Sequence, residues 1–400
     1  MYPRAPAVVL FATLIAASVL ALPAAAAPRD APAWRVLVYL DADNNLDVYA
    51  GAHHLGIVQV DLDELMAVGS AAGVDVFVLV DRWDGPARLY KVLPGTLVEQ
   101  TAWPLGGTEV NMGDPATLRS FAAFTFKASK AEHTWLTFWD HGSPDYVAWD
   151  DNPGTGADPD TLTHAEVVRA LDGYAVDVIA ADECLVAQIE VAYEYRATGL
   201  DSDYLVASEG YTGWRGYPYD AILEELVRNP QMSARELAAT IVRETQAFLS
   251  EPPYMGEEVN THAAVDLRAV PDLAAALRGL TDLLIPDMKS HVGMVTAARG
   301  GAQISYGNAA INVIDLRRFV EGIADATRSP QIRAAAIATL DALSDAVVAI
   351  QATQSTERMA GGLGITLPTQ SWGAGAYARY AFAGEGWLSF LEAYWAAVGA

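Results

Sequence analysis

Five mainly apolar runs, separated by segments with helical spacing, constrain the fold of this chain more than any other feature. The runs lie at 34–40, 74–80, 134–139, 176–181 and 204–207. A strand that is apolar nearly throughout is typical of a sheet that is buried on both faces, as in parallel sheets covered by helices. The alternation therefore predicts an α/β fold, in which a mostly parallel central sheet lies between two layers of helices.

Capping and turn residues fix several of the connections. Arg88 to Glu99 alternates and contains Pro94-Gly95, which predicts a hairpin. Asp114-Pro115 predicts the start of a helix that ends near Ser129, because proline fits the first helical turn. Thr163 and Glu166 have the spacing of a capping box, so a second helix is expected to begin there.

The last third of the chain has a mainly helical pattern. We expect one large domain over 27–400 with a helical C-terminal extension at about 230–355 and a late core strand at 361–368. A chain of this length can bury one large core. Helices are predicted at about 233–249, 269–284, 315–326, 330–352 and 387–398.

The first residues have the pattern of a signal peptide. Arg4 supplies a positive start, residues 8–22 are apolar, and residues 23–27 form a zone of small residues after a proline. We therefore predict a signal peptide over 1–26 and cleavage after Ala26 or Ala27. The mature chain is expected to be secreted, periplasmic or otherwise extracytoplasmic, with no membrane span.

The net charge of the chain limits the classes of partner that it can bind. The chain has 25 basic and 50 acidic residues, which give a formal net charge of −25. A chain this acidic is repelled by phosphate backbones and by anionic membranes, so we expect no nucleic-acid partner. The charge suits a protein or peptide substrate with basic residues, but it equally suits good solubility or a saline habitat, and it does not choose among them.

Cys184 is the only cysteine of the chain, so it has no partner for an internal disulfide. It follows the predicted strand at 176–181, and His141 follows the strand before it, at 134–139. The carboxyl ends of such strands are where α/β proteins bind ligands. A histidine beside a thiol can accept its proton, which predicts a Cys–His catalytic dyad. The residues alone also allow a buried, inert thiol.

The backbone around the two side chains supports the same chemistry. The N–H groups of Gly142 and Cys184 are expected to form an oxyanion hole. A helix is predicted over about 185–195, so the Cys184 amide is expected at a helix N-terminus, where the helix dipole favours a thiolate.

Several ordered motifs resemble the clostripain family of cysteine peptidases. They are the run 34–46, the sequence Asn-Met-Gly-Asp-Pro at 111–115, Trp139-Asp140-His141-Gly142, Asp182-Glu183-Cys184-Leu185, Ala-Ala-Val-Asp-Leu at 263–267, and the run 362–368. The resemblance covers about residues 34–397. It implies a caspase-like α/β/α sandwich and a cysteine endopeptidase that cleaves after Arg or Lys.

The resemblance also assigns roles to individual residues. It makes Cys184 the nucleophile, His141 the catalytic histidine, and Asp182 the acidic base of the specificity pocket. Ser208, Glu209 and Trp214 match the other wall of that pocket. A carboxylate facing a cationic side chain gives a physical reason for the preference. The alternative is a catalytically silent relative that binds cationic peptides or a surface partner.

Two features depart from the family pattern. Between His141 and Val168 the chain has no Lys or Arg, so self-cleavage at a basic residue in this loop is not expected. Glu183 replaces a small residue and would raise the pKa of the thiol if it faced Cys184. We expect this side chain to point away.

Hard oxygen ligands recur at Asp41, Asp43, Asn45 and Asp47, which makes them candidates for a metal site. The run lacks the glycine and the distant glutamate of an EF-hand, and a loop that caps the next helix explains it as well. The aspartates of the loop at 145–160 offer a second set of oxygens. We expect no required cofactor, but Ca2+ remains a candidate because clostripain is calcium-dependent. Four aromatic residues either line a substrate cleft or pack a long loop: Tyr211, Trp214, Tyr217 and Tyr219.

Overall fold

The computed structural model describes most of the chain after residue 30. The described residues are 31–48, 56–71, 73–154, 157–213, 215–250, 261–303, 312–352, 360–370 and 374–399. Residues 31–400 form one compact unit. The predicted signal peptide and Trp214 lie outside the described residues. Within those residues, no helix has the length and apolar character needed to span a bilayer.

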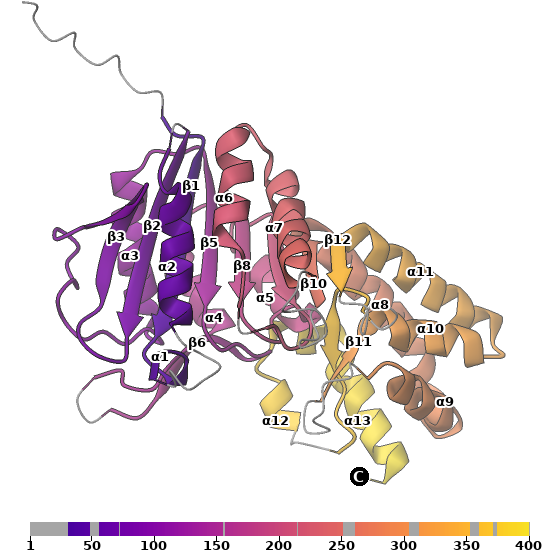
Figure 1. Cartoon of the computed structure of the whole chain (residues 1–400). Coiled ribbons are helices and arrows are strands. Elements are labelled where there is room, and N and C mark those ends of the chain that lie inside the picture. The colour runs from indigo at the N-terminus through magenta and orange to yellow at the C-terminus, as the bar shows by residue number, and fades with distance from the viewer. Residues whose placement is uncertain are drawn as a thin grey trace, which may run out of the picture. The chain divides into compact units, whose positions relative to one another are not determined.

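A nine-stranded sheet forms the centre of this unit, in the order β12-β10-β9-β8-β5-β1-β2-β3-β4 (Figure 1). Its middle is parallel, as the apolar runs predict. The parallel strands are β1 (Trp34–Ala42), β2 (Val74–Arg82), β5 (His133–Trp139), β8 (Val178–Asp182) and β9 (Tyr204–Ser208). β1 is buried along its whole length, which explains its apolar sequence.

Antiparallel strands close both edges of the sheet. β3 (Arg88–Leu93) and β4 (Thr96–Glu99) form the predicted hairpin, with Gly95 at a φ of 73° in the turn. On the other edge, β10 (Thr261–Asp266) pairs with β9 and with β12 (Val347–Ala352). The helix predicted to 352 was therefore too long, because its apolar end pairs with β10 as a strand.

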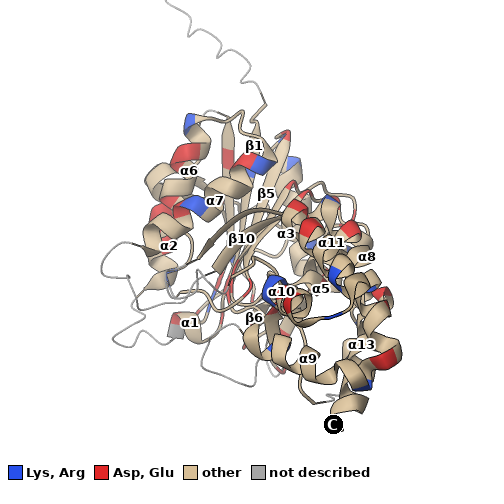
Figure 2. Ribbon diagram, turned by 90° about the vertical axis from the view of Figure 1, so that its right-hand side faces the viewer, with Lys and Arg blue, Asp and Glu red and all other residues tan. Residues whose placement is uncertain are grey.

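Helices cover both faces of the sheet, and alternate side chains of each strand supply the two cores. Leu37 and Tyr39 of β1 belong to one hydrophobic cluster, whereas Val36 and Val38 belong to the other. The first face is covered by α3 (Pro115–Ala128), α4 (His164–Leu171) and α5 (Ile189–Ala197). The second is covered by α2 (Ile57–Val68), α6 (Tyr219–Arg228) and α7 (Ala234–Leu249). Charged residues lie along the outward faces of several helices (Figure 2).

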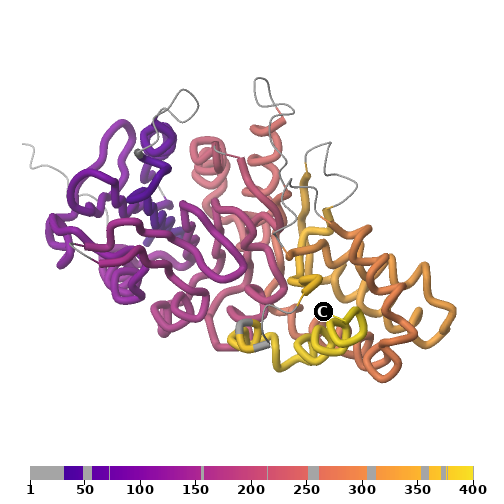
Figure 3. The backbone as a smooth tube through the Cα atoms, turned by 90° about the horizontal axis from the view of Figure 1, so that it is seen from below, coloured from indigo at the N-terminus to yellow at the C-terminus, as the bar shows by residue number. Residues whose placement is uncertain are grey.

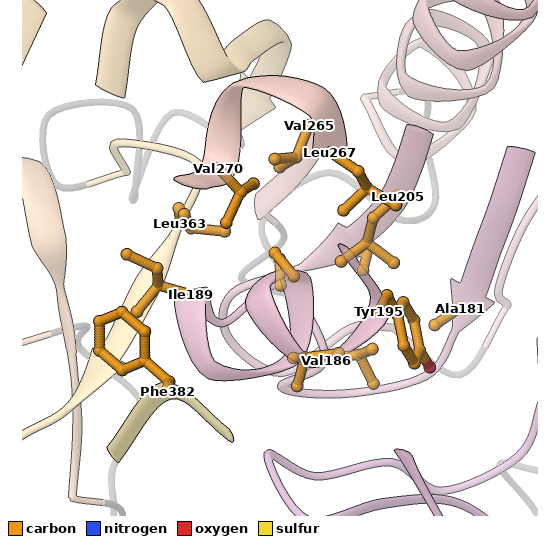
Figure 4. Packing of buried hydrophobic residues seen from close by; sticks show 14 of the residues in the cluster. Ala181, Val186, Ile189, Tyr195, Leu205, Val265, Leu267, Val270, Leu363 and Phe382 are labelled. Atoms are coloured by element: carbon orange, nitrogen blue, oxygen red, sulfur yellow. The ribbon is translucent and has the colours of Figure 1, made fainter. Parts of the chain in front are cut away.

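The C-terminal part extends the first core. Figure 4 shows Ile189 of α5 in the same cluster as Leu205, Val270, Leu363 and Phe382, which come from distant parts of the chain. The helices of this part are α8 (Val270–Leu284), α9 (Met288–Gly301), α10 (Leu316–Ala326), α11 (Pro330–Ala346) and α13 (Trp387–Val398). Sequence reasoning did not anticipate α9.

The late strand predicted at 361–368 is shorter in the structure and lies outside the main sheet. β13 (Gly364–Thr366) pairs with β11 (Val313–Asp315) in a separate two-stranded sheet. Glycines at 361, 362 and 364 and Pro368 limit the run that can pair. An isolated bridge from Gly364 to Gln188 connects this small sheet to the segment that carries Cys184.

A second two-stranded sheet lies beside the carboxyl end of β5. It consists of β6 (Tyr146–Asp150) and β7 (Asp160–Thr163), both from the acidic loop after His141. Three short helices complete the described structure near the site and the C-terminus: α1 (Asn45–Val48), α12 (Ala374–Tyr377) and η3 (Ala381–Glu385). Figure 3 shows the backbone from below, coloured by residue number.

Candidate active site

The sheet register brings His141 and Cys184 to the same edge of the molecule. β5 and β8 are parallel neighbours, and Trp139 lies opposite Asp182 at their carboxyl ends. His141 and Cys184 each follow their paired residue by two positions. Both side chains line one cavity of about 390 Å³. The other residues that line it are Leu46, Ile57, Trp139, Asp140, Asp182, Tyr211, Thr212, Gly213 and Gly216.

Asn45 positions the imidazole of His141. The His141 Nε2 atom lies 2.8 Å from the Asn45 amide oxygen, which can only accept a hydrogen bond. In the neutral ring Nε2 therefore carries the hydrogen, and Nδ1 is the basic atom. Burial lowers the pKa of His141, and the charge of Asp151 partly opposes this. Sequence reasoning placed Asn45 among the metal candidates and missed this role.

The Cys184 thiol is half-buried and lies beside the backbone of the opposite loop. Its Sγ accepts a hydrogen bond from the Thr212 N–H at 3.4 Å. The helix predicted to begin beside it starts later, at Ile189, with Gln188 as its N-cap. Leu185 has a φ of 64°, which is incompatible with an α-helix. The expected helix-dipole effect on Cys184 is therefore wrong, and the local N–H of Thr212 supplies a polar contact instead.

Gly142 occupies a position with no room for a side chain. A Cβ atom there would lie 2.7 Å from Oε2 of Glu183 and 2.9 Å from the carbonyl oxygen of Cys184. The backbone of Gly142 is thus in direct contact with the segment that carries the thiol. Glu183 is fully buried and its Oε1 accepts the Ala148 N–H at 3.3 Å, so its carboxyl is tied to β6. Burial raises the pKa of Glu183 well above its usual value.

Asp182 forms a buried acidic wall of the cavity. Its Oδ2 accepts the Tyr217 N–H at 2.9 Å and the Tyr219 hydroxyl at 3.1 Å. Its Oδ1 has no hydrogen-bond partner among the described residues. Burial raises the pKa of Asp182 to about 7, although both hydrogen bonds oppose the change. A Cβ atom at Gly216 would lie 2.5 Å from Oδ2, so no side chain fits between this backbone and the carboxylate.

The motifs and the fold agree with comparisons to known proteins. The model of the Clostripain family matches residues 38–383. The chain belongs to the clostripain family. Clostripain from Hathewaya histolytica is 28% identical over 226 residues, which are 48% of this chain and 41% of the relative. The match thus spans less than half of that relative's length.

Solved structures of other family members share the caspase-like fold. A secreted C11 cysteine protease from Bacteroides thetaiotaomicron, in complex with an irreversible peptide inhibitor, aligns with a TM-score of 0.67. The alignment covers 90% of this chain and 99% of that protein, at 16% identity. An inactive zymogen C11 protease from Parabacteroides distasonis aligns with a TM-score of 0.66, covering 89% and 98%, at 17% identity.

Two of the residues predicted for the second pocket wall point elsewhere in this clostripain-family chain. The Ser208 hydroxyl lies 3.0 Å from that of Thr261. The Glu209 carboxyl is directed toward the Gly362 N–H and is hydrogen-bonded to Asp315. Burial and the charge of Asp315 raise the pKa of Glu209 well above its usual value. Neither side chain lines the cavity.

The predicted aromatic cluster divides between the two roles considered for it. Tyr211 lines the cavity. Tyr217 and Tyr219 are fully buried, and the Tyr217 N–H and the Tyr219 hydroxyl donate hydrogen bonds to Asp182. With Thr212 and Gly213, Tyr211 supplies the wall that was assigned to Ser208 and Glu209.

The four residues predicted as metal ligands do not form one site in the structure, because they make different contacts. Asn45 contacts His141, and Asp47 forms an ion pair with Arg82 at 2.7 Å. Asp41 is fully buried, and its Oδ2 has no hydrogen-bond partner among the described residues. Among the described residues, Asp43 is the one of these four that joins a group of oxygens fitting a cation.

Asp43, Asp81 and Glu109 present carboxylate oxygens that all lie within 4.8 Å of one another. Asp81 is fully buried, and neither of its oxygens has a partner among the described residues. Burial and the charge of Glu109 raise its pKa to about 9. Hard oxygen donors of this kind suit Ca2+. Sequence reasoning missed Asp81 and Glu109, although Asp81 lies near the end of β2, directly opposite Asp41 of β1.

Proposed function

We propose that this chain is a cysteine endopeptidase that cleaves peptide bonds after Arg or Lys. One observation carries the proposal: His141, Cys184 and the acidic Asp182 line the same cavity. A nucleophile, a base and a counter-charge for the substrate side chain are thus within reach of one bound peptide. The predicted signal peptide supports a secreted or extracytoplasmic protein, which would meet protein substrates outside the cell.

The proposed reaction proceeds in two stages. His141 accepts the thiol proton, and the Cys184 sulfur attacks the carbonyl carbon of the scissile bond. The oxyanion is stabilised by the N–H groups of Gly142 and Cys184. The C–N bond then breaks, and the leaving amine receives the proton from His141.

Water completes the cycle. His141 accepts a proton from water as the water oxygen attacks the carbonyl carbon of the thioester. The C–S bond then breaks, the peptide leaves as a carboxylic acid, and His141 returns the proton to the Cys184 sulfur. Groups of the chain and water balance every step, so we propose that no cofactor takes part in the chemistry.

Asp182 gives the cavity its proposed selectivity. A guanidinium or ammonium group beside the unpartnered Oδ1 would stabilise the ionised carboxylate in an environment where burial disfavours it. A neutral or acidic side chain offers no such compensation.

Purified protein is incubated with otherwise identical fluorogenic peptides that end in Arg, Lys or Asp. We expect cleavage after Arg and Lys and none after Asp, because only a cation compensates the buried Asp182 carboxylate. The assays contain reductant and are run with and without Ca2+. No cleavage of either basic peptide would contradict the proposal. The rate of iodoacetamide alkylation near neutral pH then tests the silent alternative, since an inert thiol reacts slowly.

We also propose that Ca2+ binds at Asp43, Asp81 and Glu109. A bound cation would compensate the two orphan oxygens of Asp81, and ligand binding to the folded state raises stability. We expect saturating Ca2+ to raise the melting temperature by roughly 5 °C. Asp81→Asn should abolish the increase, whereas Asp47→Asn should retain it, because Asp47 is paired with Arg82. An equal increase in both variants would contradict the assignment.

A further inference from the structure

A second cavity, of about 370 Å³, lies beside the first but over the other face of the sheet. The active-site cavity is lined by Leu46, Ile57 and Trp139, which belong to the core under α2 and α6. The second is lined by the Pro144–Tyr146 segment and by residues of β7, α4 and α5, such as Val191, which belong to the opposite core. The edge that carries Cys184 therefore lies between the two cavities.

The loop after His141 connects the two cavities. From Gly142 the chain runs through Ser143 directly into Pro144, which lines the second cavity. The Ser143 carbonyl accepts a hydrogen bond from His164 Nε2 at 3.1 Å, and its N–H donates to the Tyr146 carbonyl at 2.9 Å. Burial raises the pKa of Tyr146 to about 12, with further contributions from nearby charges that include Cys184. Tyr146 lines the second cavity and follows Gly142 by four positions.

The charged side chains of the second cavity are mainly acidic. Asp145, Glu190 and Glu194 line the cavity together with one guanidinium, that of Arg379, which pairs with Asp145. Glu190 Oε1 accepts hydrogen bonds from the Thr366 N–H and the Tyr377 hydroxyl, and Glu194 Oε2 accepts one from the Ala381 N–H. His164 also lines the cavity, but burial lowers its pKa to about 4, so it is neutral near pH 7. Glu190 is fully buried, and its Oε2 has no hydrogen-bond partner among the described residues. The cavity is therefore suited to a cation.

Arg379 already shows how the cavity binds a cation. Its guanidinium lies 2.5 Å from Asp145 Oδ1, and the Tyr380 hydroxyl donates to the same oxygen. Both side chains are carried by a C-terminal segment that packs on α5 through Phe382, whose ring lies 5.5 Å from that of Tyr193. The Arg379 side chain is 59% exposed, so a ligand can displace it without unfolding the segment.

We propose that the second cavity is a subsite for a basic side chain at one of the two positions that follow the scissile bond. The inference rests on the proposed peptidase function. A peptide that places its Arg or Lys against Asp182 and its carbonyl carbon at Cys184 continues across the sheet edge toward Tyr146. The substrate class is therefore a peptide with basic residues on both sides of the cleaved bond.

Internally quenched peptides with one cleavable Arg test the subsite. They carry either Lys or its neutral near-isostere norleucine at each of the two following positions in turn. Every rate is divided by the rate of the same variant on a fluorogenic arginine amide, which has no residue after the bond. We expect the Lys peptide to be preferred about fivefold at one position, as for a partly exposed ion pair. Asp145→Asn should remove this preference, and Arg379→Gln should increase it by removing the internal competitor.

Asp158→Asn is the matched control, because Asp158 is an exposed aspartate of the same loop and does not line the cavity. An equal rate for Lys and norleucine peptides at both positions in the parent protein would overturn the subsite. If the fluorogenic amide is not cleaved, the proposed function fails. The subsite is then tested by calorimetric titration of Cys184→Ala with the dipeptide Lys-Ala amide, where binding that depends on Asp145 supports it and no binding refutes it.

Discussion

Replacing Cys184 by alanine is expected to reduce cleavage of the arginine peptide by at least about 10^4-fold, to background. His141→Gln should reduce it by about 10^3-fold, because the thiol loses its base while the oxyanion donors remain. Steady-state kinetics with the fluorogenic arginine peptide measures both effects. The two losses should not add in the double variant, since the two groups act as one unit.

A matched histidine controls for the His141 variant. His133 lies at the other end of the same strand, β5, and its Nδ1 lies 2.8 Å from Asp177. His133→Gln should leave kcat/KM within about twofold of the parent, since surface changes are usually mild. The melting temperatures of all variants establish that they fold. Full activity in folded His141→Gln would contradict the dyad.

The parallel core of the fold was predictable because its strands are buried on both faces. Strands such as β1 and β5 have no polar face, and this leaves a signal in a single sequence. The edge strand β12 could not be recognised. Val347 to Ala352 continues the apolar pattern of α11, and only its pairing with β10 makes it extended.

The positions of the candidate site residues were more predictable than their supporting contacts. Asp182 ends a buried strand, and His141 and Cys184 each follow the end of a buried strand by two positions, so local sequence indicates where they lie. Asn45 approaches His141 from 96 positions away in sequence, and no local pattern reports such a contact. Glu209 follows β9 directly, but its carboxyl turns to Asp315 of the C-terminal part. The direction in which a side chain points depends on its tertiary contacts, which a single sequence does not reveal.

Asp182→Asn should reduce kcat/KM for the arginine peptide by about 100-fold or more, because a buried guanidinium would lose the carboxylate that compensates its charge. Asparagine can still accept the Tyr217 N–H and occupies nearly the same volume, so folding should be preserved. Cleavage of the otherwise identical citrulline peptide, whose side chain is neutral, should change by less than about fivefold. A parallel loss on both peptides would mean that Asp182 shapes the site instead of selecting charge.

The pH dependence gives a second, independent measure of the same carboxylate. Because burial raises the pKa of Asp182 to about 7, the group is neutral below that pH and ionised above it. The ratio of kcat/KM for arginine to that for citrulline should therefore rise as the pH increases through about 7. Titration of His141 and Cys184 cancels in this ratio, since both peptides use the same dyad. In Asp182→Asn the ratio should be low and independent of pH. A parent ratio that stays constant from pH 5 to 9 would show that Asp182 does not titrate near 7, and the selectivity would then need another source.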